Sequence, residues 1–249
     1  MIAVSDLEAN GFYDTVTNVH CIVSIDYETL ELFISPHDFG LGLGTVISHM
    51  EHIALLQTAD KVVGHNWIMY DSPVLNKVLG CPIPELADVD DTFIMSSLFN
   101  PDIAIPKGCS KGAHSLEAWG LRMNYEKGDV DNFDTYTPDM LQYCIRDVQI
   151  TAKLYRKLQA IRAKHDWELS LKLEYTMARI QSDQEIHGLV LDESRAYDLV
   201  EELTEEIVKI EDKILPLVPA KPKQWGVDVM EPFKLDGSLK KMVTDWYHD

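Results

Sequence analysis

Short runs of β-branched and apolar residues, separated by turn residues, dominate the first sixty positions of the sequence. Residues 2–4, 19–25 and 30–34 are typical of strands that follow one another along a sheet as a meander. Helical spacing appears over residues 47–58, and a buried strand is then indicated at residues 61–63. This alternation of strands and helices predicts an α/β fold with a layered sheet.

The middle of the chain combines one clear helix start with a loop-rich stretch. Asp71, Ser72 and Pro73 predict a helix that has a capping residue and a proline in its first turn. Prolines and glycines then interrupt residues 81–139, where residues 92–99 and 114–121 have helical spacing. We therefore expect mobile loops over this region, broken by two short helices.

Three longer helices are predicted after this region. They cover residues 138–163, residues 166–185 with a stop at Gly188, and about residues 192–217. In the last of them, apolar residues alternate three and four apart opposite a row of glutamates, which is coiled-coil spacing over two heptads. Prolines in the tail from residue 216 onward indicate a linker or a partially ordered segment.

Composition limits the classes of protein to which the chain can belong. The 249 residues carry 41 Asp+Glu against 22 Lys+Arg, a formal net charge of −19, which disfavours docking on bare polyanions or anionic membranes. The four cysteines are spread singly, so neither a zinc site nor a disulfide framework is indicated. No apolar run approaches the roughly 20 residues that span a bilayer. We expect a soluble, cytoplasmic protein from a reducing compartment.

Two acidic residues follow the first predicted strand. Asp6 and Glu8 lie two apart, and the period-2 geometry of extended chain points both carboxylates to the same side. Such a pair can hold divalent metal ions. Two solvated acids at a strand end are the plainer interpretation in a chain with 41 acids, and the spacing alone does not decide between them.

Two further groups of polar residues occupy suggestive positions. Asn66 follows the strand at 61–63, at the edge of the sheet where ligands bind in open α/β folds, and Asp71 opens the next helix, where it could equally be a cap. Tyr143 and Asp147 lie four apart in a predicted helix, so both address one point in space. Asp147 falls among apolar residues, where a charge requires a cation, a donor or a distant basic partner.

Together these elements resemble the three exonuclease motifs of the DEDDy 3′-to-5′ exonucleases. The resemblance rests on Asp6-Leu7-Glu8, on Asn66 and Asp71 in Gly64-His65-Asn66-(x)4-Asp71-Ser72-Pro73, and on Tyr143-(x)3-Asp147. Asp91-Thr92 and the segment His114-Ser115-Leu116-Glu117-Ala118-Trp119-Gly120 are similar to the proofreading domain of family A DNA polymerases, above all those of short-tailed phages of the T-seven type. The likeness covers about residues 1–160.

The resemblance implies a ribonuclease-H-like (DnaQ-like) fold and a metal-dependent 3′-5′ DNA exonuclease that proofreads for a phage-type replicative polymerase. Two Mg²⁺ or Mn²⁺ ions would be held by Asp6, Glu8, Asp71 and Asp147, and Tyr143 would orient the attacking water. Oxygen ligands without His or Cys favour these ions over Zn²⁺. A phenol ordinarily titrates near pH 10, so it is mostly protonated at neutral pH and is not a strong base there.

Other residues are secondary candidates for substrate binding. Leu7 and Phe12 could pack against the terminal base, Asn66 could bond the substrate, and His65 and His114 could contact the terminal phosphate. Core packing and structural hydrogen bonds are the alternatives at each of these positions. A basic run without acids could follow a DNA backbone or form a solvated face; it comprises Lys153, Arg156, Lys157, Arg162 and Lys164.

The resemblance also implies a division of the chain. Residues 1–165 would form the exonuclease domain and residues 166–249 a helical extension similar to the entry into a family A polymerase domain, without fingers or palm. We expect a partner that is a polymerase subunit or the remainder of a polymerase chain, a single-stranded or frayed DNA 3′ end as substrate, no membrane, and an infected bacterial cell as host. The alternatives are an RNA-trimming exonuclease and a non-catalytic polymerase scaffold.

Overall fold

The computed structural model describes residues 1–81, 88–125, 133–217 and 238. Two compact units divide the chain, the first from Met1 to Leu189 and the second from Val190 onward. Parts of the loop region expected over residues 81–139, and nearly all of the tail expected from residue 216, lie outside the described residues. In the described part of the chain, no helix is both long and apolar enough to cross a membrane.

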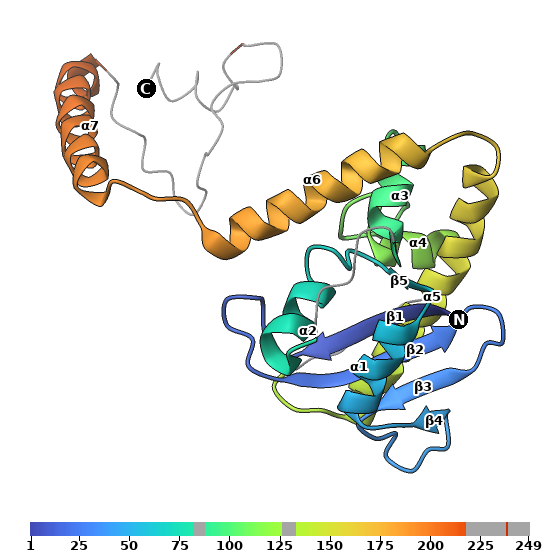
Figure 1. Cartoon of the computed structure of the whole chain (residues 1–249). Helices are drawn as coiled ribbons and strands as arrows, with labels where there is room; N and C mark the ends of the chain where they lie inside the picture. Colours follow the sequence, from blue (N-terminus) through green and yellow to red (C-terminus); the bar gives the residue numbers. More distant parts are fainter. Residues whose placement is uncertain (82–87, 126–132, 218–237, 239–249) are drawn as a thin grey trace, which may run out of the picture. The chain divides into compact units, whose positions relative to one another are not determined.

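A mixed sheet of six strands lies at the centre of the first unit, in the order β4-β3-β2-β1-β5-β6 (Figure 1). The strands are β1 Ile2–Ala9, β2 Val19–Asp26, β3 Leu32–Ser35, β4 Thr45–Val46, β5 Lys61–Gly64 and β6 Val89–Asp91. The first three form the expected antiparallel meander, and β5 and β6 run parallel to β1. The α/β prediction is therefore confirmed.

Helices cover the sheet and extend beyond it. They are α1 His49–Thr58, α2 Asp71–Leu79, α3 Thr92–Phe99, α4 Leu116–Arg122, α5 Pro138–Arg162 and α6 Glu168–His187 in the first unit, and α7 Glu193–Ile214 in the second. Figure 1 shows α1 in front of the sheet and α5 behind it, where α5 packs against β1 and β2. Side-chain caps begin several of these helices, as at Ser48, Thr137 and Asp192.

Several predicted boundaries differ from the structure. Strand β1 does not end before Asp6 but continues to Ala9, because its residues from Ala3 to Ala9 pair with β2. Asp71 is not the cap of α2: Tyr70 holds the N-cap position without a side-chain bond, and Asp71 is the first helical residue. The short strands β4 and β6 were not predicted, since two and three residues show no periodicity.

Helix α6 belongs to the first unit and packs against its core. Leu171, Tyr175 and Ala178 are buried in the same core as the sheet, and Gly188 ends the helix with a positive φ of 67°. The expected boundary after residue 165 thus falls inside a compact unit that runs on to Leu189. The assignment of residues 1–165 to an exonuclease domain and of residues 166–249 to a helical extension stays a prediction.

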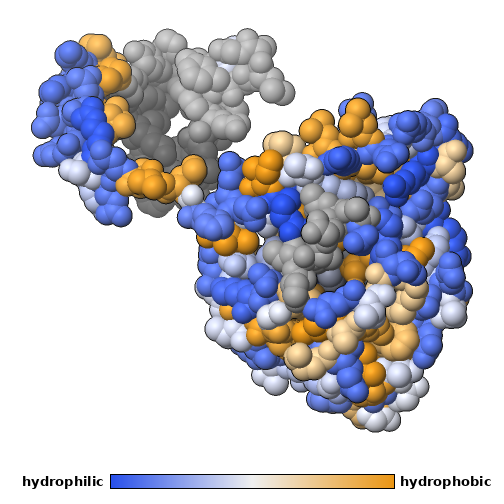
Figure 2. Space-filling model, in the orientation of Figure 1, coloured by the Kyte–Doolittle hydropathy of each residue, from blue (hydrophilic) through white to orange (hydrophobic). Residues whose placement is uncertain are grey.

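Helix α7 is strongly amphipathic. None of its residues is buried, and Val200, Leu203 and Ile207 are each more than half exposed. In Figure 2 most of this helix is coloured hydrophilic, with hydrophobic residues gathered along one side. The heptad-like spacing of the sequence therefore forms one apolar face on a helix.

Candidate active site

One cleft in the first unit brings together residues from β1, the turn after β5, and helices α2, α4 and α5. Its volume is about 520 Å³, and it is lined by Asp6, Leu7, Glu8, Phe12, His65, Asn66, Tyr70, Asp71, Phe93, Lys111, Ser115, Leu116, Glu117, Tyr143 and Asp147. All four candidate acids and the candidate tyrosine are among these residues. Of the secondary candidates, His114 is absent from the lining: its Nδ1 lies 3.2 Å from the hydroxyl of Ser96.

The acid pair belongs to the interior of β1. Asp6 and Glu8 stand opposite Val23 and Cys21 of β2, and a register irregularity follows Glu8. Leu7 is 4% exposed and belongs to the hydrophobic core, although it also borders the cleft that its acidic neighbours Asp6 and Glu8 line. The sheet thus fixes two carboxylates side by side on a rigid element.

The thiol of Cys144 lies close to this pair. One ligand atom each from Asp6, Glu8 and Cys144 lies within 4.8 Å of the others, a grouping that could hold a metal ion. Burial raises the pKa of the Cys144 thiol well above its usual value, and the thiol donates to the backbone oxygen of Asp6 at 3.6 Å. The thiol is therefore a hydrogen-bond donor here, and the carboxylates are the groups that could supply oxygen ligands to a metal ion.

The turn between β5 and α2 is held by the carboxylate of Asp91, the last residue of β6. Asp91, which is fully buried, accepts hydrogen bonds from the backbone N–H of Asn66 at 3.0 Å and of Ile68 at 3.1 Å. The same carboxylate caps α3. Asn66 has a φ of 67°, a left-handed conformation that asparagine tolerates better than most residues. Gly64 is required because a Cβ there would lie 2.7 Å from that of Trp67.

This turn delivers Asp71 to the acid cluster. Asp71 is 4% exposed, and burial, together with the nearby charges of Asp6 and Asp91, raises the pKa of its carboxyl well above the usual value. A carboxylate in this position is costly to ionise unless a cation lies beside it. The clustering of buried acids fits divalent cations that prefer oxygen ligands.

Helix α5 contributes the remaining pair. Tyr143 is half-buried and Asp147 is 4% exposed, and both line the cleft from one side of the helix. The cap at Thr137 and the proline after it fix where the helix begins. The spacing argument from the sequence is therefore matched by the positions of both side chains.

Several lining residues were missed by the sequence reasoning. Tyr70 donates from its hydroxyl to the carbonyl of Gly11 at 2.8 Å, and burial with the charges of Asp71, Glu8 and Asp6 raises the pKa of Tyr70 to about 12. Lys111 brings a cation to the cleft from a loop. Tyr70 stands directly before Asp71, so its proximity could have been read from the sequence, whereas a loop lysine gives no periodic signal.

The secondary candidates have different surroundings. Phe12 is 84% exposed at the edge of the cleft. The Thr92 hydroxyl donates to the carbonyl of Gly64 at 3.0 Å and so accepts from Nδ1 of His65 at 2.9 Å. His65 is thereby oriented by the start of α3, and Phe12 offers an exposed aromatic surface.

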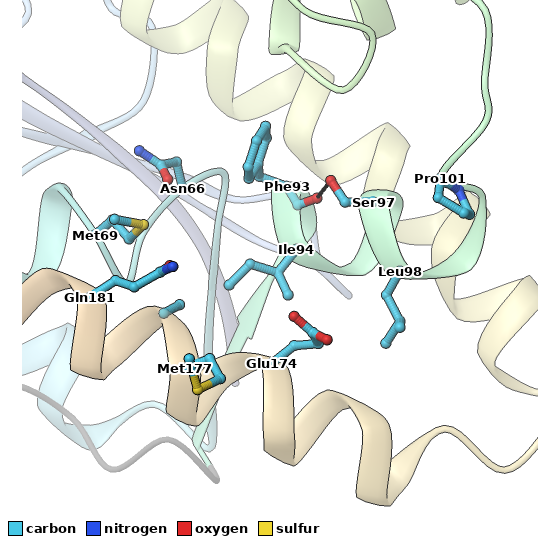
Figure 3. A pocket seen from close by; sticks show the side chains of 11 residues that line it. Asn66, Met69, Phe93, Ile94, Ser97, Leu98, Pro101, Glu174, Met177 and Gln181 are labelled. Atoms are coloured by element: carbon cyan, nitrogen blue, oxygen red, sulfur yellow. Dashed lines mark hydrogen bonds between the residues drawn. The ribbon is translucent and has the colours of Figure 1, made fainter.

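A second pocket adjoins the cleft between α3 and α6. It shares Asn66 and Phe93 with the cleft, has a volume of about 510 Å³, and is lined in addition by Met69, Ile94, Ser97, Leu98, Pro101, Glu174, Met177, Ala178 and Gln181. Figure 3 shows α3 and α6 facing each other across this mostly apolar space, with the Ser97 hydroxyl bonded to the carbonyl of Phe93.

The chain is similar in sequence to phage DNA polymerases. It is 28% identical over 254 residues to the DNA-directed DNA polymerase of Escherichia phage T7, and 27% identical over 253 residues to that of Enterobacteria phage T3. Each alignment covers 80% of this chain and 35% of the phage protein, so the chain spans about a third of the length of these curated relatives. The resemblance to phage DNA polymerases is thus confirmed. No protein-family profile matches the chain.

Proposed function

We propose that the chain is a metal-dependent 3′-5′ DNA exonuclease that releases nucleoside monophosphates and proofreads for a phage-type DNA polymerase. The observation that carries this proposal is the convergence of Asp6, Glu8, Asp71, Tyr143 and Asp147 on one cleft. The similarity to two phage polymerases supports the association with DNA synthesis. The meander followed by parallel strands supports a ribonuclease-H-like fold.

The acid cluster fits two Mg²⁺ or Mn²⁺ ions. Asp6, Glu8 and Asp147 would hold the first ion, and Asp6 and Asp71 the second. When bound, such ions lower the pKa of the attacking water and stabilise charge on the leaving oxygen of a phosphodiester. The raised pKa of Asp71 supports this assignment, since the buried carboxylate gains most from a neighbouring cation.

The other side chains position the substrate. The Tyr143 hydroxyl hydrogen-bonds the attacking water and orients it for in-line attack on phosphorus. Lys111 attracts the terminal phosphate, and the exposed ring of Phe12 packs on the terminal base. Asn66, fixed through its backbone by Asp91, bonds the sugar or base of the last nucleotide.

The test compares Asp6→Ala/Glu8→Ala with the control Glu28→Ala/Asp102→Ala, which removes two exposed acids outside the cleft. Each protein is incubated with 5′-labelled single-stranded DNA and Mg²⁺, and the shortening of the labelled strand is measured. We expect wild type and control to degrade DNA and the cleft variant to be inactive. Activity retained in the cleft variant, or its absence in wild type, would refute the assignment.

Matched RNA distinguishes the substrate class. A 5′-labelled RNA of the same sequence is incubated under the same conditions, and the initial rates of shortening are compared. We expect DNA to be degraded faster. Preferential trimming of RNA would contradict the proofreading role while leaving the site assignment intact.

A further inference from the structure

A pocket lined by four cations lies apart from the cleft, at the far end of α4. It has a volume of about 610 Å³ and is lined by Arg122, Met123, Asn124, Lys153, Arg156, Lys157 and Ala160. No acid lines it among the described residues. In a protein of net charge −19, such a concentration of positive charge needs an explanation. These four cations are called the basic pocket below.

Among the described residues, no carboxylate neutralises the charges of the basic pocket. None of the four forms an ion pair in the described part of the chain. By contrast, Arg162, from the same basic run, forms an ion pair with buried Asp90 at 3.1 Å and therefore has a structural role. Sequence alone does not separate these two kinds of cation, whereas the structure does.

Contacts with aromatic rings and a carbonyl hold two of these cations, Arg122 and Lys153, in place. The Arg122 guanidinium stacks 4.7 Å from the ring centre of Trp119 and donates from Nη2 to the carbonyl of Ala104 at 2.8 Å. The Lys153 ammonium lies 3.4 Å from the ring centre of Tyr125. Nη1 of Arg122 is buried and has no hydrogen-bond partner among the described residues, so the exposed cations on α5 are the groups that an anion can reach directly. The pocket therefore offers oriented donors to an anion.

Two helices connect the basic pocket to the cleft. Helix α4 begins beside the cleft at Leu116 and ends at Arg122, a rise of about 10 Å. Along α5, Lys153 and Lys157 lie about 9 and 15 Å beyond Asp147. At about 3.4 Å per stacked nucleotide, these distances correspond to roughly three to four nucleotides.

We propose that the basic pocket binds the phosphate backbone of the DNA strand whose 3′ end lies in the cleft, roughly three to four nucleotides from that end. This inference rests on the proposed function. A backbone suits the pocket better than a free phosphate compound, because Lys153, Arg156 and Lys157 are exposed and spread along α5. Pockets for small ligands enclose most of the ligand. The site also supplies the DNA affinity that an acidic chain otherwise lacks.

The experiment uses two triple variants that remove the same charge. Lys153→Ala/Arg156→Ala/Lys157→Ala empties the α5 side of the pocket, and alanine preserves the helix. The control has alanines at three exposed lysines outside the basic run, Lys172, Lys209 and Lys213. Steady-state hydrolysis with Mg²⁺ is measured on a trinucleotide and on a twelve-nucleotide DNA, and binding of the longer DNA is followed by fluorescence anisotropy in EDTA as salt increases.

We expect the pocket variant to raise KM for the long DNA about tenfold at unchanged kcat, with no change for the trinucleotide. In EDTA, the slope of log affinity against log salt should fall by about 2, at roughly 0.7 per lost phosphate contact on a single strand. The control should match wild type. Equal KM and salt slope in the two triple variants would overturn the proposal.

A free-phosphate occupant and a failure of the proposed function give different results. If the pocket variant lost affinity for thymidine monophosphate or pyrophosphate but bound the long DNA as wild type does, the backbone assignment would be wrong. If wild type released no nucleotide, yet the salt slope still depended on the pocket, the phosphate site would stand and the exonuclease assignment would fall.

Discussion

Replacing Asp91 by alanine tests how the turn that carries Asn66 and Asp71 is held. The Asp91 carboxylate accepts hydrogen bonds from the N–H groups of Asn66 and Ile68 on one side and of Phe93 and Ile94, in the first turn of α3, on the other. Burial raises the pKa of this carboxyl, and the four N–H donors oppose that rise. The side chain thus joins two segments distant in sequence.

The cost of the substitution follows from these bonds. Loss of a helix cap costs about 1 kcal/mol, the buried N–H of Ile68 left without an acceptor about 2 kcal/mol, and the less buried N–H of Asn66 about 1 kcal/mol. Removal of a buried charge returns part of this sum. We therefore expect the free energy of unfolding to fall by about 3 kcal/mol.

Urea unfolding followed by tryptophan fluorescence at pH 7 measures this loss. Thr137→Ala is the matched control, because Thr137 caps α5 through one bond to Met140 and joins no second segment. It should cost about 1 kcal/mol. A loss for Asp91→Ala no larger than that of the control would refute the reasoning that the carboxylate holds the turn.

Three further predictions follow from individual contacts. Asp90→Asn should lower the free energy of unfolding by about 3 kcal/mol, since Arg162 loses its buried carboxylate; a loss below about 1 kcal/mol would contradict this. Burial lowers the pKa of His52 to about 3, so the unfolded chain binds its proton first as pH falls. Protonation of His52 in the unfolded chain should therefore lower the free energy of unfolding by about 2 kcal/mol from pH 7.5 to 5. Urea unfolding at both pH values should show that His52→Gln lacks this part of the pH dependence. Tyr143→Phe should lower kcat about a hundredfold with DNA binding kept; unaltered turnover would remove its proposed role.

The sequence predicted the elements with strong periodicity. The long helix α5, with its Thr137 cap, and α6, with its stop at Gly188, form where apolar spacing and capping residues agree. The first two strands of the antiparallel meander have eight residues each and are rich in β-branched and apolar residues, so they too were predictable from the local pattern. Local chemistry and tertiary packing agree in these segments.

The misses occur where tertiary contacts override the local pattern. Asp6 and Glu8 interrupt an apolar run and were placed after the strand, yet pairing with β2 keeps them inside it. Aspartate is a residue type that commonly caps helices, yet Asp71 lies one residue after the N-cap position. The turn before it is shaped instead by Asp91, which accepts a hydrogen bond from it across the sheet from β6. Such long-range hydrogen bonds leave no periodic signal. Arg162 likewise differs in role from the cations of the basic pocket because it pairs with buried Asp90, a partner distant in sequence.

The candidate site was predicted as a set of residues, not as a geometry. Spacing placed Tyr143 and Asp147 on one side of a helix, but only the fold brings them to the acids of β1. His114, a candidate for the terminal phosphate, lies with its Nδ1 3.2 Å from the Ser96 hydroxyl, and its contact with substrate stays a prediction. A histidine in a loop has no pattern that would distinguish these two roles.

The direction of hydrolysis tests the central claim most directly. Wild-type protein is mixed with one single-stranded DNA labelled at its 5′ end and the same DNA labelled at its 3′ end, with Mg²⁺ added to start the reaction. The 3′ label should leave at once as a monophosphate, while the 5′ label passes through a ladder of fragments one nucleotide shorter at each step. Early release of the 5′ label, internal cuts, or equal rates in EDTA would contradict a metal-dependent 3′-5′ exonuclease.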